Sequence, residues 1–148
     1  MGDDARRRGS DSRVCKPWDA PYAWQMYLDP EHSGAQGLAE WLEGLSEFNQ
    51  NHIEGQIDDL FDAAEQGELE DTGDEKTPIK PVHPNPEIFE LRLKQLNKKL
   101  RFYHGEPDFM PSALVSIHEH IKTTNKAQSL EIGFAAKRYQ RGRSSYWR

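Results

Sequence analysis

The spacing of apolar residues changes from a helical to a strand-like period about halfway along this chain of 148 residues. In the first half, apolar side chains recur at intervals of three and four, as they do in an amphipathic helix. They form two runs: Leu38, Trp41, Leu42, Leu45 and Phe48, then Ile53, Ile57, Leu60, Phe61 and Ala64. The opposite side carries acidic residues. The pattern predicts a helical hairpin whose second helix ends near Gly67.

The second half alternates apolar and polar residues, as half-buried strands do. Residues 88–94 and 98–104 both alternate, and the short segment 95–97 between them suits a hairpin turn. A third strand is expected at 113–121, with Ala113, Val115 and Ile117 pointing inward. A terminal helix is expected at 129–140, after which the chain is basic.

These elements, with a first strand at 22–28, predict an α+β fold. We expect a three- to four-stranded antiparallel sheet that carries the helical hairpin on one face and a short C-terminal helix. The other face of the sheet is expected to be solvated. The single domain is predicted at 21–142, between a flexible N-terminal tail (1–20) and a C-terminal tail (143–148), with an acidic, proline-rich loop at 68–86.

Charge is segregated along the chain, although the formal net charge is only -6. Residues 17–75 contain sixteen acidic residues and no Lys or Arg, whereas residues 76–148 contain fourteen basic and six acidic residues. The C-terminal half therefore suits a nucleic-acid partner, which the overall charge would argue against. The acidic half could mimic a nucleic acid, but a solvated helix face is the more common use of such a pattern.

The sequence lacks the features that are typical of several other classes of protein. The longest apolar runs are far shorter than the ~20 residues that span a bilayer, and the charged N-terminus has no apolar segment of a secretory signal behind it. A lone Cys15 suits a reducing cytoplasm. The chain lacks the short motifs of nucleotide-binding proteins, zinc proteases and serine hydrolases. We therefore expect a cytoplasmic protein with no membrane segment and no cofactor.

The solvated face of the predicted sheet collects the candidate functional residues. Its members are Arg92, Lys94, Lys99, Arg101, Tyr103, His118 and His120, with Lys122 and Lys126 in the exit loop of the third strand and Arg138 on the terminal helix. Cations neutralise phosphate, and a tyrosine ring can stack on an unpaired base, so the set suits RNA. If this face is catalytic, a ribose 2′-OH would attack its own phosphate without a metal, and His, Tyr or Lys would transfer the protons.

Two alternatives accompany this interpretation. Outward charges on a sheet serve solubility in many proteins. His118 and His120, two apart on one strand face, could hold a metal ion, but Glu119 between them should point to the other face, so no metal site is predicted.

The C-terminal half resembles the RelE/HigB toxin superfamily, most closely its phage-related HigB-type group. The resemblance lies in the segments Glu87–Arg92, Leu100–Tyr103, Val115–His118 and Ile121–Lys126, followed by a helix that ends Ala136-Lys137-Arg138-Tyr139. It covers about residues 22–142, with its specific part at 87–139. The sequence departs from the family at Glu119, His120 and Gln128, and residues 68–77 look like an insertion.

The resemblance implies an mRNA endonuclease that acts at the ribosome and is neutralised by a small helix-turn-helix antitoxin. Carried over by position, Arg92, Arg101, Lys122, Lys126 and Arg138 match basic positions of the family. His118 matches a histidine at the end of the third strand. The hypothesis gives Arg92, Arg101 and Lys126 the role of phosphate binding, and makes His118 or Tyr103 the proton-transfer group.

A second hypothesis uses the same fold without catalysis. In it, the chain is a phage or mobile-element protein that binds a protein or a nucleic acid, and its acidic hairpin engages a basic partner or occupies a nucleic-acid site. Members of one fold differ in activity, so likeness of fold transfers more safely than function.

Overall fold

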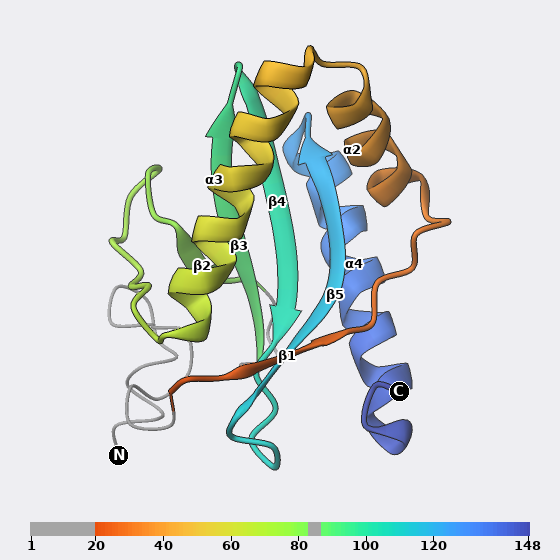
Figure 1. Cartoon of the computed structure of the whole chain (residues 1–148). Helices are drawn as coiled ribbons and strands as arrows, with labels where there is room; N and C mark the ends of the chain where they lie inside the picture. The colour runs from red at the N-terminus through yellow and green to blue at the C-terminus, as the bar shows by residue number, and fades with distance from the viewer. Residues whose placement is uncertain (1–19, 83–86) are drawn as a thin grey trace.

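The computed structural model describes residues 20–82 and 87–148, which form a five-stranded sheet with helices on both faces (Figure 1). The strand order is β1-β5-β4-β3-β2. The strands are β1 (Ala23–Met26), β2 (Ile79–Pro81), β3 (Ile88–Gln95), β4 (Lys98–Gly105) and β5 (Ala113–Lys122). The predicted α+β class and the three central antiparallel strands are confirmed.

The sheet is mixed, which corrects the prediction of a purely antiparallel one. β1 pairs in parallel with β5, whereas the other neighbouring strands pair antiparallel. β2, an additional edge strand, lies within the predicted loop 68–86 and pairs with β3. Its three residues include Pro81, which breaks the alternation that identifies a strand in a sequence.

The β3–β4 hairpin turns on Leu96 and Asn97, whose φ angles are 48° and 64°. Two consecutive residues with positive φ form the tight turn whose twist matches that of paired strands. This turn fixes the register in which Arg92 lies opposite Arg101.

Two helices, α2 (Ser33–Glu43) and α3 (Glu47–Glu65), cover one face of the sheet, as predicted. Ser46 begins α3 by accepting a hydrogen bond from the N–H of Asn49. The core on this side contains Leu38, Ile53, Leu60 and Ala64 from the helices and Phe89, Leu91, Leu100, Phe102 and Leu114 from the strands. In Figure 1, α3 lies in front of β3 and β4, and α2 lies beside β5.

The opposite face of the sheet is covered by α4 (Asn125–Gly142), which corrects the prediction of a solvated face. The helix begins four residues earlier than expected because Thr124 caps it, its hydroxyl accepting from the N–H of Ala127. Its apolar stripe packs on the sheet and includes Ile132, Ala135, Ala136 and Tyr139. Arg101, Tyr103, His118 and His120, all expected to be exposed, are consequently buried.

A β-bulge in β5 explains why the face assignment failed there. Tyr103 pairs with His118 and His104 with Ser116, which leaves Ile117 as an extra residue. The extra residue brings Ile117 and His118 onto the same side, facing α4. Val115 and Ile117, predicted to face the helical hairpin, therefore pack beneath α4, and Leu114 faces the hairpin instead.

The C-terminal end of the chain packs against α4. Residues 143–148, assigned to a tail from the sequence, contain the short helix η3 (Arg143–Ser145) and Trp147, which is 2% exposed and donates its indole N–H to the carbonyl of Tyr139 at 2.9 Å. The predicted N-terminal tail lies, apart from residue 20, outside the described residues. Among the described helices, none is long and apolar enough to cross a membrane.

Candidate nucleic-acid interface

Three cross-strand rows of polar side chains lie on the face of the sheet that α4 covers. Residues that are directly opposite in an antiparallel ladder share a face, so the register of β3, β4 and β5 places them together. From the hairpin end inward, the rows are Lys94–Lys99–Lys122, then Arg92–Arg101–His120, then Glu90–Tyr103–His118. Lys80 of β2 pairs with Glu90 and extends the inner row.

The outermost row, Lys94–Lys99–Lys122, consists entirely of cations and is called the lysine row below. Lys94 and Lys99 are exposed and Lys122 is half-buried, and the first turns of α4 hydrogen-bond to the sheet further in, where Gln128 meets the inner row. Burial lowers the pKa of Lys122, and the charges of Arg101 and Lys99 lower it further. Like charges in direct opposition destabilise a sheet, so an anion bound here would relieve their repulsion.

The middle row is held by one carboxylate. The Nε atoms of Arg92 and Arg101 lie 3.1 Å and 3.3 Å from the same oxygen of Glu90. Both are within ion-pair distance, but neither Nε–H makes a hydrogen bond. Burial raises the pKa of Glu90 and lowers that of Arg101, so for both groups the loss of hydration outweighs the mutual attraction. One carboxylate thus faces several cations, and positive charge remains in excess.

The inner row forms a buried network with α4. Gln128 donates its side-chain N–H to Glu90 at 2.6 Å and to the hydroxyl of Tyr103 at 3.4 Å. That hydroxyl lies 2.8 Å from Nε2 of His120. Glu131 contacts both histidines, with an oxygen 3.0 Å from Nε2 of His118 and 3.8 Å from Nδ1 of His120.

Burial determines the protonation of this network. It raises the pKa of Tyr103 far above its ordinary value and lowers that of His120 to about 4. The pKa of His118 is also lowered by burial, although the hydrogen bond to Glu131 opposes the shift. At neutral pH, Tyr103 is therefore protonated and both imidazoles are uncharged. As arranged, these groups join α4 to the sheet and are closed to solvent.

His32, His118 and Glu131 could be considered as metal ligands, since one donor atom from each lies within 4.8 Å of the others. Their hydrogen bonds oppose this. Nδ1 of His32 accepts from the N–H of Gly34 at 3.0 Å, which places the proton of the neutral ring on Nε2. Nε2 of His118 faces a carboxylate, which accepts only, so this nitrogen also carries a proton. The three groups fit a hydrogen-bonded cluster better than a metal site.

Two of the predicted RNA-binding residues lie apart from the rows. Lys126 is exposed in the first turn of α4, close in the chain to Lys122. Arg138 lies about 18 Å further along the helix, at ~1.5 Å per residue. Its guanidinium covers the ring of Tyr27 at 4.1 Å and donates to the carbonyl of the same residue. Arg138 thus anchors α4 to the segment after β1.

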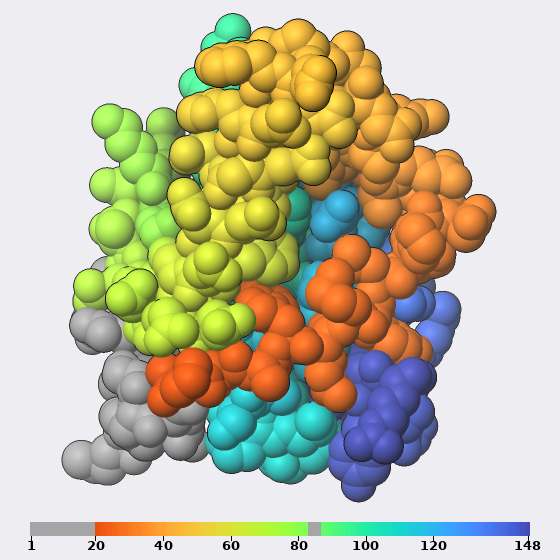
Figure 2. Space-filling model, in the orientation of Figure 1, coloured from red at the N-terminus to blue at the C-terminus, as the bar shows by residue number. Residues whose placement is uncertain are grey.

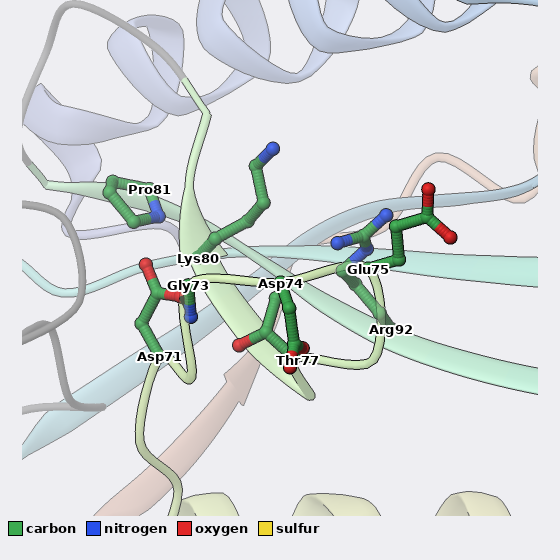
Figure 3. Close-up of a pocket in the computed structure, with 8 residues that line it drawn as sticks. All are labelled: Asp71, Gly73, Asp74, Glu75, Thr77, Lys80, Pro81 and Arg92. Carbon is green, nitrogen blue, oxygen red and sulfur yellow. Dashed lines mark hydrogen bonds between the residues drawn. The ribbon is translucent and has the colours of Figure 1, made fainter.

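The acidic loop before β2 borders the middle row. A pocket of about 520 Å³ lies between this loop and the sheet (Figure 3). Asp71, Asp74 and Glu75 line it on the loop side, and Lys80 and Arg92 on the strand side. This side of Arg92 is therefore unfavourable to phosphate, and the open approach to the cations is from the lysine row.

Sequence analysis missed four members of the network: His32, Glu90, Gln128 and Glu131. Glu90 shares strand parity with Arg92, and this was a usable signal for a buried ion pair. Gln128 and Glu131 are spaced three apart, which places them on one helix face, but only the docking of α4 shows that this face is buried. Nothing local in the sequence relates His32 to His118.

Comparison of the chain with protein-family models, with curated proteins and with solved structures gave no match.

Proposed function

We propose that the chain is a RelE/HigB-type toxin that binds mRNA through the lysine row and Arg92. The observation that carries the proposal is the excess of cations at the open end of the sheet, where Lys94, Lys99 and Lys122 lie in one row. A phosphate between them and Arg92 would neutralise charges that otherwise repel one another. The order of elements (a strand, two helices, antiparallel strands and a helix) is the one predicted from the sequence in which the resemblance was found, and it is consistent with the proposal.

In the proposed reaction, a ribose 2′-OH attacks the adjacent phosphate and no metal takes part. Arg92 and Lys122 are half-buried cations that act electrostatically on Glu90, as Lys80 also does, and they lie nearest the lysine row, so they are the candidates to stabilise the charge of the pentavalent intermediate. The 2′-OH loses its proton to solvent water as its oxygen bonds to phosphorus, and the bond between phosphorus and the 5′ oxygen breaks. Lys122, whose pKa is lowered, is the candidate to protonate that leaving oxygen. Tyr103 and His118 would reach the phosphate only if the first turns of α4 moved away. Of the predicted cations, the site proposed here keeps Arg92, Lys94, Lys99 and Lys122, and Lys122 takes the proton-transfer role predicted for Tyr103 or His118.

One observation favours a second candidate function, a non-catalytic RNA-binding module. Tyr103, His118 and His120 are each less than 5% exposed and are engaged with one another, Gln128 or Glu131. Groups committed in this way stabilise a fold rather than transfer protons. The partners under both functions, mRNA and the ribosome, are the same, and a helix-turn-helix antitoxin accompanies only the toxin.

Expression in a bacterial host separates the two functions. The wild-type chain should arrest growth and shorten transcripts, and the Lys94→Ala/Lys99→Ala/Lys122→Ala variant should do neither, because it loses the phosphate-binding row. The control is Lys137→Ala/Arg141→Ala, which removes two exposed cations from the far part of α4. Growth with intact transcripts at high levels of the wild-type chain would reject the endonuclease and leave the binding module.

A further inference from the structure

A groove on the other face of the sheet, between α2 and α3, is not used by the proposed RNA site. Figure 2 shows it as a hollow bounded by α3, α2 and β1, with β5 visible at its floor. Its volume is about 630 Å³, within the range of about 300–1,000 Å³ that is common for binding pockets. The groove exists because α2 packs on β5 while α3 packs on β3, so that the sheet between them is partly uncovered.

The walls and floor of the groove are apolar and well anchored. Trp24 donates its indole N–H to the carbonyl of Phe61 at 3.3 Å, and the two rings lie 4.8 Å apart. Phe61 in turn meets Phe102 edge-on, with ring centroids 5.4 Å apart. Met26, at the open side, is 64% exposed. Thioether and aromatic side chains in such a setting form adaptable contact surfaces for another protein.

Acidic side chains border this apolar surface. Glu54, Asp58 and Asp62 line the groove from α3 and recur every four residues, so they form one ridge along the helix beside Ile57 and Phe61. This part of the chain has no Lys or Arg to pair with them, since neither occurs between residues 17 and 75.

Glu119 adds a carboxylate to the floor. It lies opposite Phe102 in the β4–β5 ladder and points into the groove, away from the cations of the other face. Burial raises the pKa of Glu119, and within residues 20–82 and 87–148 no neighbouring cation offsets that effect. A carboxylate on an apolar floor without a counter-charge is costly to the free protein, and an arginine from a partner would supply the missing charge.

We propose that this groove, called the acidic groove, binds a basic amphipathic helix of a partner protein. The apolar stripe of that helix would cover Trp24, Phe61 and Phe102. Its arginines would pair with the ridge of Glu54, Asp58 and Asp62 and with Glu119. Phosphate and anionic lipid are excluded as occupants because the ridge repels them. The proposal does not depend on the RNA site, which lies on the opposite face of the sheet.

The test uses two fluorescein-labelled synthetic peptides of about 16 residues, the length of a typical docking helix. One peptide carries a leucine stripe flanked by arginines, and the other has glutamate in place of every arginine. Binding to the full-length protein is measured by fluorescence anisotropy at physiological salt. The arginine peptide should bind with a Kd in the micromolar range, and the glutamate peptide should not bind.

Three variants locate the binding. Glu54→Gln/Asp58→Asn/Asp62→Asn should weaken the arginine peptide by about tenfold, and Glu119→Gln by about fivefold, since both remove charges from the groove. The control Glu43→Gln/Glu47→Gln/Asp59→Asn changes the net charge by the same amount at exposed positions outside the groove, and should alter Kd less than about twofold. Equal weakening by the control and the groove variant would overturn the proposal, since it would indicate general attraction to an acidic protein.

Two further measurements guard against misfolded variants and against binding elsewhere. Glu119→Gln should melt at or above the temperature of the wild-type chain at neutral pH, because it removes a buried carboxylate that has no counter-charge. In ¹⁵N–¹H spectra of the wild-type chain, the arginine peptide should shift the indole resonance of Trp24, whose N–H bonds to Phe61. Shifts confined to residues of α4 and the lysine row would contradict the proposal.

Discussion

At the scale of single residues, the site differs from an ordinary polar surface because it buries a histidine whose pKa is strongly lowered. His120 is 4% exposed, and its pKa falls to about 4 because burial disfavours the charged ring. An imidazole in the unfolded chain takes up its proton near pH 6.5. Between those two values the unfolded chain binds a proton that the folded chain does not, so stability falls as the pH is lowered.

The resulting prediction concerns acid stability. Lowering the pH from neutrality to about 4 should cost up to about 3 kcal/mol of unfolding free energy through His120, on the basis of ~1.4 kcal/mol for each unit of pKa difference. Urea unfolding across this pH range should give a less steep pH dependence for His120→Asn than for the wild-type chain. The comparison is needed because burial raises the pKa of Glu90 and Glu119, which acts in the opposite direction. Parallel curves for the two proteins would mean that His120 titrates normally.

At the scale of elements, the docking of α4 decides which candidate residues are accessible. The ring of Tyr139 packs directly on the backbone at Gly105, the last residue of β4, where a Cβ would collide with it. The hydroxyl of Tyr139 donates to Glu87 at 2.7 Å and fixes the ring in that position. The absence of a side chain at Gly105 is therefore what allows the helix to lie close to the sheet.

Gly105→Ala should lower the unfolding free energy by about 1–3 kcal/mol, the usual cost of overpacking a well-packed contact. The matched control is Gly133→Ala within α4, where a Cβ meets nothing within 4 Å. That control should raise stability by up to about 1 kcal/mol, since alanine favours a helix over glycine. Thermal or urea unfolding measures both changes. Equal effects of the two substitutions would show that α4 does not press on Gly105.

The elements also show where sequence analysis succeeded and why it failed elsewhere. Periodicity identified α2, α3, β3, β4 and β5, because apolar side chains recur at the helical or the strand spacing along each of them. It could not reveal that Tyr103 and His118 are covered, because a strand that is apolar on one face and buried through a polar network on the other still alternates apolar and polar residues. The bulge at Ile117 was equally hidden, since one extra residue shifts the faces without changing the composition of the strand.

At the scale of the whole molecule, the segregation of charge along the chain becomes a segregation between two faces of one sheet. The acidic helices α2 and α3 occupy one face, and the lysine row lies at the open end of the other. Much of the negative charge thus lies away from the proposed RNA site. The acidic loop is the exception, because it lines the pocket beside Arg92 (Figure 3).

The central claim, that the lysine row binds RNA phosphate, is tested most directly by the salt dependence of RNA affinity. The probe is a labelled single-stranded RNA of about 12 nucleotides, comparable with common single-strand site sizes. For the wild-type chain, log Kd should rise steeply with log salt concentration. For Lys94→Ala/Lys99→Ala/Lys122→Ala the slope should be smaller by about 2, since each lost phosphate contact removes about 0.7. Lys137→Ala/Arg141→Ala should retain the wild-type slope; identical slopes for the wild-type chain and the lysine-row variant would contradict the claim.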